Sequence, residues 1–250
     1  MTNDMNTTKP QTATETAIGY IPCCMQPFSS VGNSEVYNMD CVAGMKHYPD
    51  KYFDLAIIDP PYGIDAASDK RGDTQFGKAA AKSKSYGQKD WDKTAPNLEY
   101  FCELYRVSKN QIVWGANHFI SRMPYDSSCW IVWDKDNGTN GYADCELAWT
   151  SFESAVRKVK WKWHGMLQQN MKDKESRIHP TQKPVALYEW LLMNYAEKGQ
   201  RILDTHLGSG SSRIACYNLG FDFVGFELDK DYYEAQEQRF KNHISQMRLF

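Results

Sequence analysis

The pattern of apolar and polar segments along this chain predicts strands and helices that follow one another in turn. Its strongest signal is a predicted strand at residues 53–58, whose last four residues form an uninterrupted apolar run that is followed by the sequence Asp-Pro-Pro-Tyr. Such a run followed by turn residues is typical of a strand buried on both faces of a parallel sheet. Further strand patterns occupy residues 35–37, 111–115, 129–133, 145–152, 156–163, 201–204 and 223–226. Helical patterns occupy residues 40–46, 98–107, 184–195, 211–219 and 230 onward. This mixture indicates an α/β fold.

Two segments without periodicity set the expected limits of the domain. Residues 1–32 are rich in Thr and Asn, and we expect a disordered tail there. Residues 64–90 carry Gly, Lys, Ser and Ala without a regular pattern, so we expect a flexible basic loop. No linker or internal repeat divides the remainder, which predicts a single domain over residues 33–250.

Composition narrows the class of protein. The 250 residues are 42% apolar and 24% charged, which is ordinary for a globular protein. The chain shows neither an apolar stretch that would span a bilayer nor a signal peptide, so we expect a cytoplasmic protein without a membrane partner. The seven cysteines lack a Cys-x-x-Cys spacing, which argues against a disulfide framework and against a zinc cluster.

The charge is unevenly placed, although the net charge is only −2. Residues 68–89 contain six Lys or Arg against two acids, and residues 157–183 contain eight against two. Two basic segments on a nearly neutral protein fit a directional contact with phosphates. Solvated loops would explain either segment alone equally well.

The Asp59-Pro60-Pro61-Tyr62 turn is the first candidate for chemistry. It follows the buried strand, and ligands of open α/β sheets lie beyond the carboxyl ends of the strands. Asp59 can accept one N–H of a substrate amine and the backbone carbonyl of Pro60 the other, while Tyr62 can stack on a flat ring. An ordinary turn at the end of a strand is the alternative for this tetrapeptide taken alone.

A second candidate follows the strand at 201–204. Gly208-Ser209-Gly210 lies between that strand and a helix, where backbone N–H groups can approach a ligand closely. Glu227 comes 23 positions after Asp204, a spacing at which an acid reaches a ribose in nucleotide-binding βαβ units. Arg213 replaces the third glycine of a dinucleotide fingerprint, which argues against NAD. For Glu227 and Asp229, capping of the next helix is the alternative.

Several motifs together resemble one family. DPPY at 59–62, HPTQKP at 179–184, LDTHLGSGSS at 203–212 and GFELD at 225–229 occur in the order found in the S-adenosylmethionine-dependent amino-group DNA methyltransferases that place the catalytic motif before the cofactor loop. The resemblance covers roughly residues 33–243. It implies a doubly wound, mostly parallel seven-stranded sheet of Rossmann-like type with a circularly permuted motif order. Thr205 and His206 depart from the Pro and Phe that the family commonly has.

The resemblance also implies roles for individual residues. Catalysis would involve Asp59, Pro60, Pro61 and Tyr62. Cofactor contacts would come from Asp40, Cys41, Asp59, Thr181, Lys183, Asp204, Thr205, Gly208, Ser209, Gly210, Glu227 and Leu228. A short DNA-recognition segment would fit at about 153–178, and the expected DNA contacts are Lys78, Lys82, Lys84, Arg157, Lys160, Lys162, Lys172 and Lys174. No metal site is implied.

Simpler explanations stay open for four of the side chains. Asp40 suits the N-cap of the next helix, and Lys183 suits a solvated surface. Trp161 and Trp163 alternate with lysines, which fits either a face toward nucleic acid or a strand with one buried face.

The implied reaction is methylation of the N6 amino group of adenine in DNA after base flipping, because an acid at the start of the catalytic motif is more typical of adenine targets. The N4 amino group of cytosine is the alternative, as is a catalytically silent nucleic-acid-binding partner. A protein-glutamine methyltransferase fits less well, because its motifs come in the reverse order. DNA is the expected partner, and a homodimer and a cognate restriction nuclease stay open. The resemblance also implies a prokaryotic or phage-encoded protein.

Overall fold

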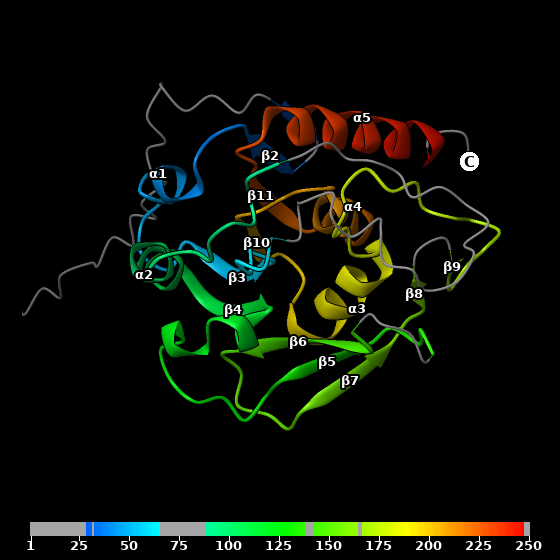
Figure 1. Ribbon diagram of the computed structural model, residues 1–250. Coiled ribbons are helices and arrows are strands. Elements are labelled where there is room, and N and C mark those ends of the chain that lie inside the picture. Colours follow the sequence, from blue (N-terminus) through cyan, green and yellow to red (C-terminus); the bar gives the residue numbers. More distant parts are fainter. Residues whose placement is uncertain (1–28, 32, 66–88, 139–142, 165–166, 248–250) are drawn as a thin grey trace, which may run out of the picture.

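The computed structural model describes residues 29–31, 33–65, 89–138, 143–164 and 167–247 (Figure 1). Within them one sheet of nine strands runs through the molecule in the order β1-β2-β11-β10-β3-β4-β6-β5-β7. These strands are β1 Ser29–Val31, β2 Ser34–Tyr37, β11 Asp222–Phe226, β10 Arg201–Asp204, β3 Phe53–Ile58, β4 Ser108–Trp114, β6 Cys145–Thr150, β5 Ile131–Asp134 and β7 Arg157–Lys160. A separate hairpin joins β8 (Trp163–His164) to β9 (Leu167–Gln168).

The strand directions confirm the predicted fold class. Strands β2, β11, β10, β3 and β4 are all parallel, whereas β6 is antiparallel to both of its neighbours. The predicted number of seven strands is too low for the described part of the chain, because β1 and β7 extend the two edges. Strand β1 lies within the range expected to be a tail and pairs antiparallel with β2. The other residues of that range that precede Asn33 lie outside the described residues.

Helices cover both faces of the sheet (Figure 1). Helices α1 (Cys41–Met45) and α2 (Leu98–Val107) pack on one face, where their apolar side chains join those of the central strands. Helices α3 (Val185–Tyr195) and α4 (Ser211–Leu219) pack on the other face, and α5 (Lys230–Met247) lies against α4. Two short 3-10 helices, η2 (Ala116–His118) and η3 (Ile120–Arg122), follow β4.

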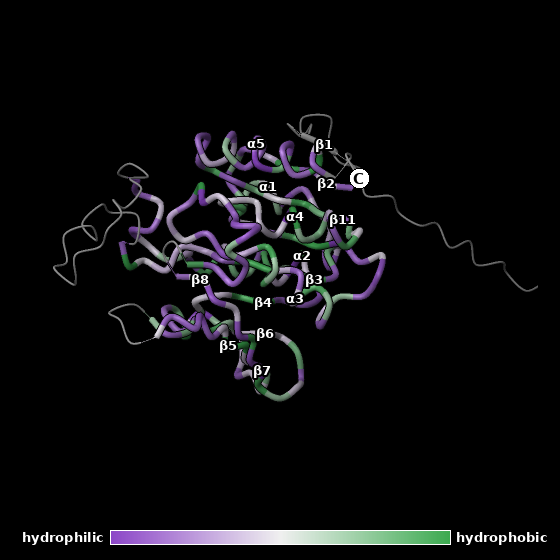
Figure 2. The backbone as a smooth tube through the Cα atoms, turned by 90° about the vertical axis from the view of Figure 1, so that its right-hand side faces the viewer, coloured by the Kyte–Doolittle hydropathy of each residue, from purple (hydrophilic) through white to green (hydrophobic). Residues whose placement is uncertain are grey.

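Strand β3 shows why residues 55–58 are all apolar. Leu55 and Ile57 pack against the α3 and α4 side, whereas Ala56 and Ile58 pack against the α1 and α2 side. All four are at most 1% exposed. A strand that is buried on both faces has no position at which a polar side chain is favourable. Apolar positions accordingly gather in the sheet at the centre of the molecule (Figure 2).

Element boundaries follow the sequence pattern closely. The predicted ranges 53–58, 98–107, 201–204 and 211–219 coincide with β3, α2, β10 and α4. The pattern at 156–163 is divided, because its two halves form β7 and the first strand of the β8–β9 hairpin. No helix in the described ranges combines the length and apolar character needed to cross a membrane.

Candidate active site

Three acids follow the carboxyl ends of three neighbouring parallel strands. Asp59 follows β3, Asp204 is the last residue of β10, and Glu227 follows β11; β10 lies between the other two strands. Because these strands run in the same direction, their carboxyl ends share one edge of the sheet, where ligands of this architecture bind. The two candidate segments that are about 145 residues apart in sequence therefore meet at one place in the fold.

The Asp59 carboxylate is enclosed by two donors. Its Oδ1 accepts a hydrogen bond of 2.6 Å from the Tyr62 hydroxyl, and its Oδ2 lies 2.5 Å from the Lys183 ammonium. Burial raises the pKa of Asp59, and the Lys183 charge opposes this shift. The Lys183 side chain is only 3% exposed, so a solvated surface lysine is the wrong interpretation of this residue.

Lys183 also links the Asp59–Tyr62 turn to the glycine loop. Its backbone carbonyl accepts a hydrogen bond of 2.7 Å from the hydroxyl of Ser211, which immediately follows Gly210. Its ammonium additionally lies 3.1 Å from Glu146 and 3.3 Å from the Tyr62 hydroxyl. One residue of the HPTQKP segment thus touches both candidate segments, which were predicted separately.

The Tyr62 ring packs against groups that follow β4. The His118 ring lies parallel to it, with the ring centroids 4.9 Å apart and the planes 15° from parallel. A Cβ atom at Gly115 would come within 2.0 Å of the Tyr62 ring, and Gly115 has a φ of +69° that favours glycine. The sequence QIVWGANHF therefore forms the wall against which Tyr62 rests.

The glycine loop faces Glu227. The backbone N–H of Gly208 donates to Glu227 Oε2 at 2.7 Å, and the backbone N–H of Asp229 donates to Oε1 at 2.8 Å. Gly208 and Gly210 have φ angles of +50° and +72°, which explains the two glycines of the loop. Burial raises the pKa of Glu227. Asp229 accepts the N–H groups of Asp231 and Tyr232, so the capping interpretation of Asp229 is confirmed.

Asp204 is held inside the loop. Its carboxylate accepts hydrogen bonds from the Ser212 hydroxyl at 2.5 Å and from the backbone N–H of His206 at 3.0 Å. Burial raises the pKa of Asp204 to about 7 and lowers that of His206 to about 4. Thr205 and His206, which stand where the resembling family commonly has Pro and Phe, are held by polar contacts. The Thr205 hydroxyl lies 2.6 Å from that of Tyr100 and 3.0 Å from His206 Nδ1.

The start of the HPTQKP segment packs beside the loop. His179 is buried, with its ring centroid 4.3 Å from that of Tyr232 and 5.0 Å from that of Trp91. Burial lowers the pKa of His179 to about 3, so the ring is neutral at physiological pH. His179 Nδ1 lies 3.1 Å from the Thr181 hydroxyl, which fixes the orientation of Thr181.

The remaining cofactor candidates lie around the start of α1 and after β11. Asp40 accepts the backbone N–H of Ala43 at 2.8 Å, so its N-cap interpretation is confirmed. The Cys41 thiol has its pKa raised to about 12 by burial, which keeps it uncharged. Ser209 is buried in the loop, and Leu228 is 71% exposed beside Glu227. Their contacts with a cofactor stay predictions.

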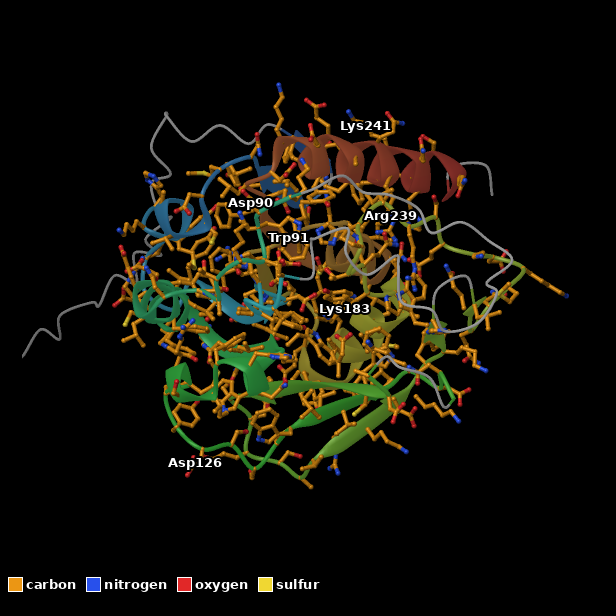
Figure 3. The ribbon with its side chains drawn as sticks, in the orientation of Figure 1. Asp90, Trp91, Asp126, Lys183, Arg239 and Lys241 are labelled. Carbon is orange, nitrogen blue, oxygen red and sulfur yellow. The ribbon has the colours of Figure 1, made fainter. Side chains whose placement is uncertain are left out.

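Sequence reasoning missed a short segment that ties the site together. Lys89 forms ion pairs with Asp229 at 2.8 Å and Asp231 at 2.6 Å. Trp91 packs on His179, and the buried Asp92 carboxylate accepts the backbone N–H groups of Tyr62 and Gly63 at 2.7 and 3.0 Å. Residues 89–92 therefore contact the Asp59–Tyr62 turn, the HPTQKP segment and the start of α5. Figure 3 shows Trp91 and Lys183 near the centre of the molecule.

Sequence reasoning also missed two charged side chains near Lys183, namely Glu146 and Lys135. Glu146 of β6 forms an ion pair with Lys183 and a second one with Lys135, which follows β5. The side chains of Lys135 and Glu146 are 19% and 23% exposed. Glu146 lies in the range 145–152, which was predicted only as a strand, and Lys135 lies two residues beyond the predicted strand at 129–133.

The basic residues expected to contact DNA divide into two groups. Lys78, Lys82 and Lys84 lie outside the described residues. Arg157 and Lys160 lie exposed on the edge strand β7, with Lys162 following; Lys172 and Lys174 are exposed in the segment before α3. Lys160 and Lys162 both pair with Asp136, at 2.9 and 3.2 Å. DNA contact by these residues stays a prediction.

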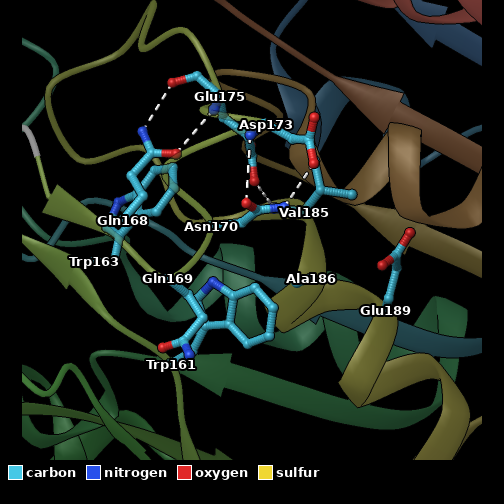
Figure 4. A pocket seen from close by; sticks show the side chains of 10 residues that line it. All are labelled: Trp161, Trp163, Gln168, Gln169, Asn170, Asp173, Glu175, Val185, Ala186 and Glu189. Atoms are coloured by element: carbon cyan, nitrogen blue, oxygen red, sulfur yellow. Dashed lines mark hydrogen bonds between the residues drawn. The ribbon is translucent and has the colours of Figure 1, made fainter.

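A pocket of about 210 Å³ lies beside this basic segment (Figure 4). Trp161 and Trp163 line one side and Glu189 of α3 another. Trp163 is buried, and its indole N–H donates to the carbonyl of Gln182 at 2.7 Å, so this tryptophan belongs to the core. Trp161 is half-buried. Among the described residues no group of His, Cys, Asp or Glu side chains is arranged to hold a metal ion.

Comparison with known proteins shows that this chain is similar to DNA methylases. The family model N6_N4_Mtase, described as DNA methylase, matches residues 135–238. YubD of Escherichia coli (strain K12), a protein described as a methylase, is 27% identical over 222 residues, which cover 80% of this chain and 87% of YubD.

Two solved structures share the fold. The M1.HpyAVI–SAM complex matches with a TM-score of 0.50 and 20% identity, covering 82% of this chain and 99% of that one. The PvuII DNA methyltransferase, which is cytosine-N4-specific, matches with a TM-score of 0.55 and 10% identity, covering 87% and 93%. The predicted resemblance to the amino-group DNA methyltransferases is confirmed by these findings together.

Proposed function

We propose that this protein transfers a methyl group from S-adenosylmethionine to the N6 amino group of adenine in DNA, after the base has been flipped out of the helix. The observation that carries the proposal is the partly buried Asp59 carboxylate, which lies at the same edge of the sheet as the Gly208–Gly210 loop and is linked to it through Lys183. An acceptor for an amine and a loop for a nucleotide-like cofactor are what this reaction requires.

The chemistry follows from the weak nucleophilicity of an exocyclic amine, whose lone pair is delocalised into the ring. Asp59 would accept one N–H of the amine, and the backbone carbonyl of Pro60 would accept the other. Hydrogen bonds to a charged acceptor in a site that excludes water are stronger than those in solvent. They favour a pyramidal nitrogen with an available lone pair.

Tyr62 would provide the surface on which the flipped base stacks. Stacking of a base on an aromatic side chain contributes roughly 1–3 kcal/mol. The ring is held in place by Gly115, by His118 and by the bonds that Asp92 makes to its backbone. The sulfonium methyl group is already activated, so positioning it in line with the amine supplies much of the remaining rate.

The cofactor would lie along the glycine loop. The backbone N–H groups of 208–210 and the Glu227 carboxylate suit its ribose and neighbouring groups. Glu227 now accepts the N–H of Gly208, so a bound ribose would compete for that oxygen. Thr181, held by His179, suits the methionine end.

Adenine is preferred over cytosine because the catalytic motif begins with an acid, which resembles the adenine-directed members. The N4 amino group of cytosine is the second candidate, since the matching family model includes both activities by name and the PvuII enzyme of the same fold is cytosine-N4-specific.

Incubation with methyl-labelled S-adenosylmethionine and unmethylated DNA tests the proposal directly. After digestion to nucleosides, we expect the label on N6-methyladenine, and an Asp59→Ala protein serves as the control. Label on N4-methylcytosine would transfer the proposal to the second candidate. Absence of label from every nucleoside would refute it.

A further inference from the structure

Four charged side chains form a continuous line that ends at the catalytic turn. Lys135 pairs with Glu146, Glu146 lies 3.1 Å from the Lys183 ammonium, and Lys183 lies 2.5 Å from Asp59. The four come from three different parts of the chain, namely the β5–β6 region, the HPTQKP segment and the turn after β3. Their formal charges alternate and sum to zero.

Lys183 needs this arrangement because it is almost fully buried. A buried ammonium is stable only if opposite charges and acceptors replace the water that it has lost. Burial lowers the pKa of Lys183, but Asp59 and Glu146 outweigh this effect and raise the pKa above its ordinary value. The ammonium also lies over the Trp114 ring at 5.4 Å.

Glu146 joins Lys135 to Lys183, because it forms an ion pair with each of them. Although burial acts in the opposite direction, the ammonium groups of Lys183 and Lys135 lower the pKa of Glu146 to about 2. It therefore stays ionised and gives Lys183 a second acceptor. When a target amine approaches Asp59, the Lys183 ammonium can keep its ion pair with Glu146 and yield one oxygen of Asp59 to the amine.

We propose that Glu146, supported by Lys135, is a positioning residue for methyl transfer, which holds the charged Lys183 beside Asp59 so that Asp59 stays an ionised acceptor for the target amine. This inference rests on the proposed function. Glu146 acts through Lys183 and needs no contact with the substrate.

Other titratable groups around Asp59 and Lys183 affect the test. Tyr62 and Tyr188 of α3 have pKa values well above their ordinary range because of burial, so both stay neutral. His179, which feels the Lys183 charge, is neutral above about pH 3. Asp204 of β10, with a pKa of about 7, is common to all variants and contributes the same background to each.

The test is the pH dependence of kcat, measured with methyl-labelled S-adenosylmethionine for the wild-type protein, Glu146→Gln and Glu146→Asp. In Glu146→Gln the ammonium loses one of its two carboxylates, so burial should lower the pKa of Lys183 into the alkaline range. We expect kcat to fall by about tenfold per pH unit above that pKa, whereas the wild type stays level. Glu146→Asp keeps the charge and should restore the level profile.

Glu103→Gln is the matched control, because Glu103 pairs with Arg106 on α2 and its side chain is 18% exposed, similar to Glu146. We expect its profile to have the shape of the wild type. An identical shape for Glu146→Gln, merely scaled down, would show that Glu146 only fills space and would overturn the inference.

Two further outcomes are decisive. If thermal unfolding shows that Glu146→Gln does not fold, Lys183→Met decides instead: loss of the cation should raise the pKa of Asp59 and displace the acidic limb of the profile to higher pH. An undisplaced limb would overturn the inference. If the wild-type protein itself transfers no label, the proposed function has failed, and this inference fails with it.

Discussion

Replacing Glu227 tests whether its carboxylate binds the ribose of a cofactor or only accepts backbone N–H groups of the protein. Its carboxylate accepts two backbone N–H groups, from Gly208 at 2.7 Å and from Asp229 at 2.8 Å. If the hydroxyl groups of a ribose also donate to this carboxylate, Glu227→Ala removes a charged acceptor for the ligand as well as for the backbone of the loop.

The magnitudes follow from those contacts. A hydrogen bond to a charged group contributes about 1.5–3 kcal/mol, so loss of the contact to a ribose should weaken cofactor binding by about 10- to 150-fold. Loss of the loop contacts should lower the free energy of unfolding by about 1–3 kcal/mol, because the backbone N–H groups of Gly208 and Asp229 lose their acceptor.

Isothermal titration calorimetry with S-adenosylmethionine measures the first effect, and urea unfolding measures the second. Asp229→Ala is the matched control, since Asp229 also caps two backbone N–H groups, at 2.9 and 3.2 Å. We expect the control to lose stability while its Kd changes little. A Glu227→Ala protein with reduced stability but the wild-type Kd would refute the ribose role and leave only the capping role.

Three further predictions concern neighbouring features. Gly115→Ala would force a Cβ atom against the Tyr62 ring and strain a φ of +69°. We therefore expect kcat to fall by at least about tenfold with an unchanged cofactor Kd. A wild-type kcat would show that the position of the Tyr62 ring does not affect methyl transfer. His206 has a pKa of about 4 in the folded state, below its unfolded value, so between about pH 4 and pH 6.5 the folded state binds fewer protons than the unfolded state. The contribution of His206 to stability is therefore lost as the pH falls through that window. His206→Phe should flatten the pH dependence of stability in urea unfolding, and an unchanged slope would contradict the lowered pKa of His206. Lys172→Ala should weaken DNA binding and reduce the slope of log affinity against log salt by about 1. Lys46→Ala is the control, because Lys46 follows α1 and pairs with Glu99 of α2, and it should leave the slope unaltered. Equal slopes in all three proteins would remove Lys172 from the DNA contacts.

The sequence predicted the central sheet well because its strongest patterns are local. Residues 55–58 are apolar without interruption, and the 201–226 region alternates strand and helix with glycines at the turn. The edges were harder, since β1 is only three residues long and pairs through its backbone with β2. The pattern at 156–163 gave no indication that it would be divided between two sheets.

The site shows the same contrast between local and distant information. Asp59 and Glu227 were expected at strand ends, and both lie there, because position after a strand is a property of the neighbouring sequence. The partners of Lys183 were not foreseen, since Glu146 and Asp59 lie 37 and 124 positions away in the chain. Asp92, which holds the backbone of Tyr62, follows a stretch without pattern and carries no signal of its own.

The central claim is that the Asp59 carboxylate activates a ring amine for capture of the sulfonium methyl group. Single-turnover transfer by Asp59→Asn, compared with the wild type and with Asp50→Asn at the exposed partner of Arg106, tests it most directly. We expect the transfer rate of Asp59→Asn to fall by at least about 10²–10³-fold with cofactor affinity largely intact. Transfer at the wild-type rate by Asp59→Asn would contradict the claim.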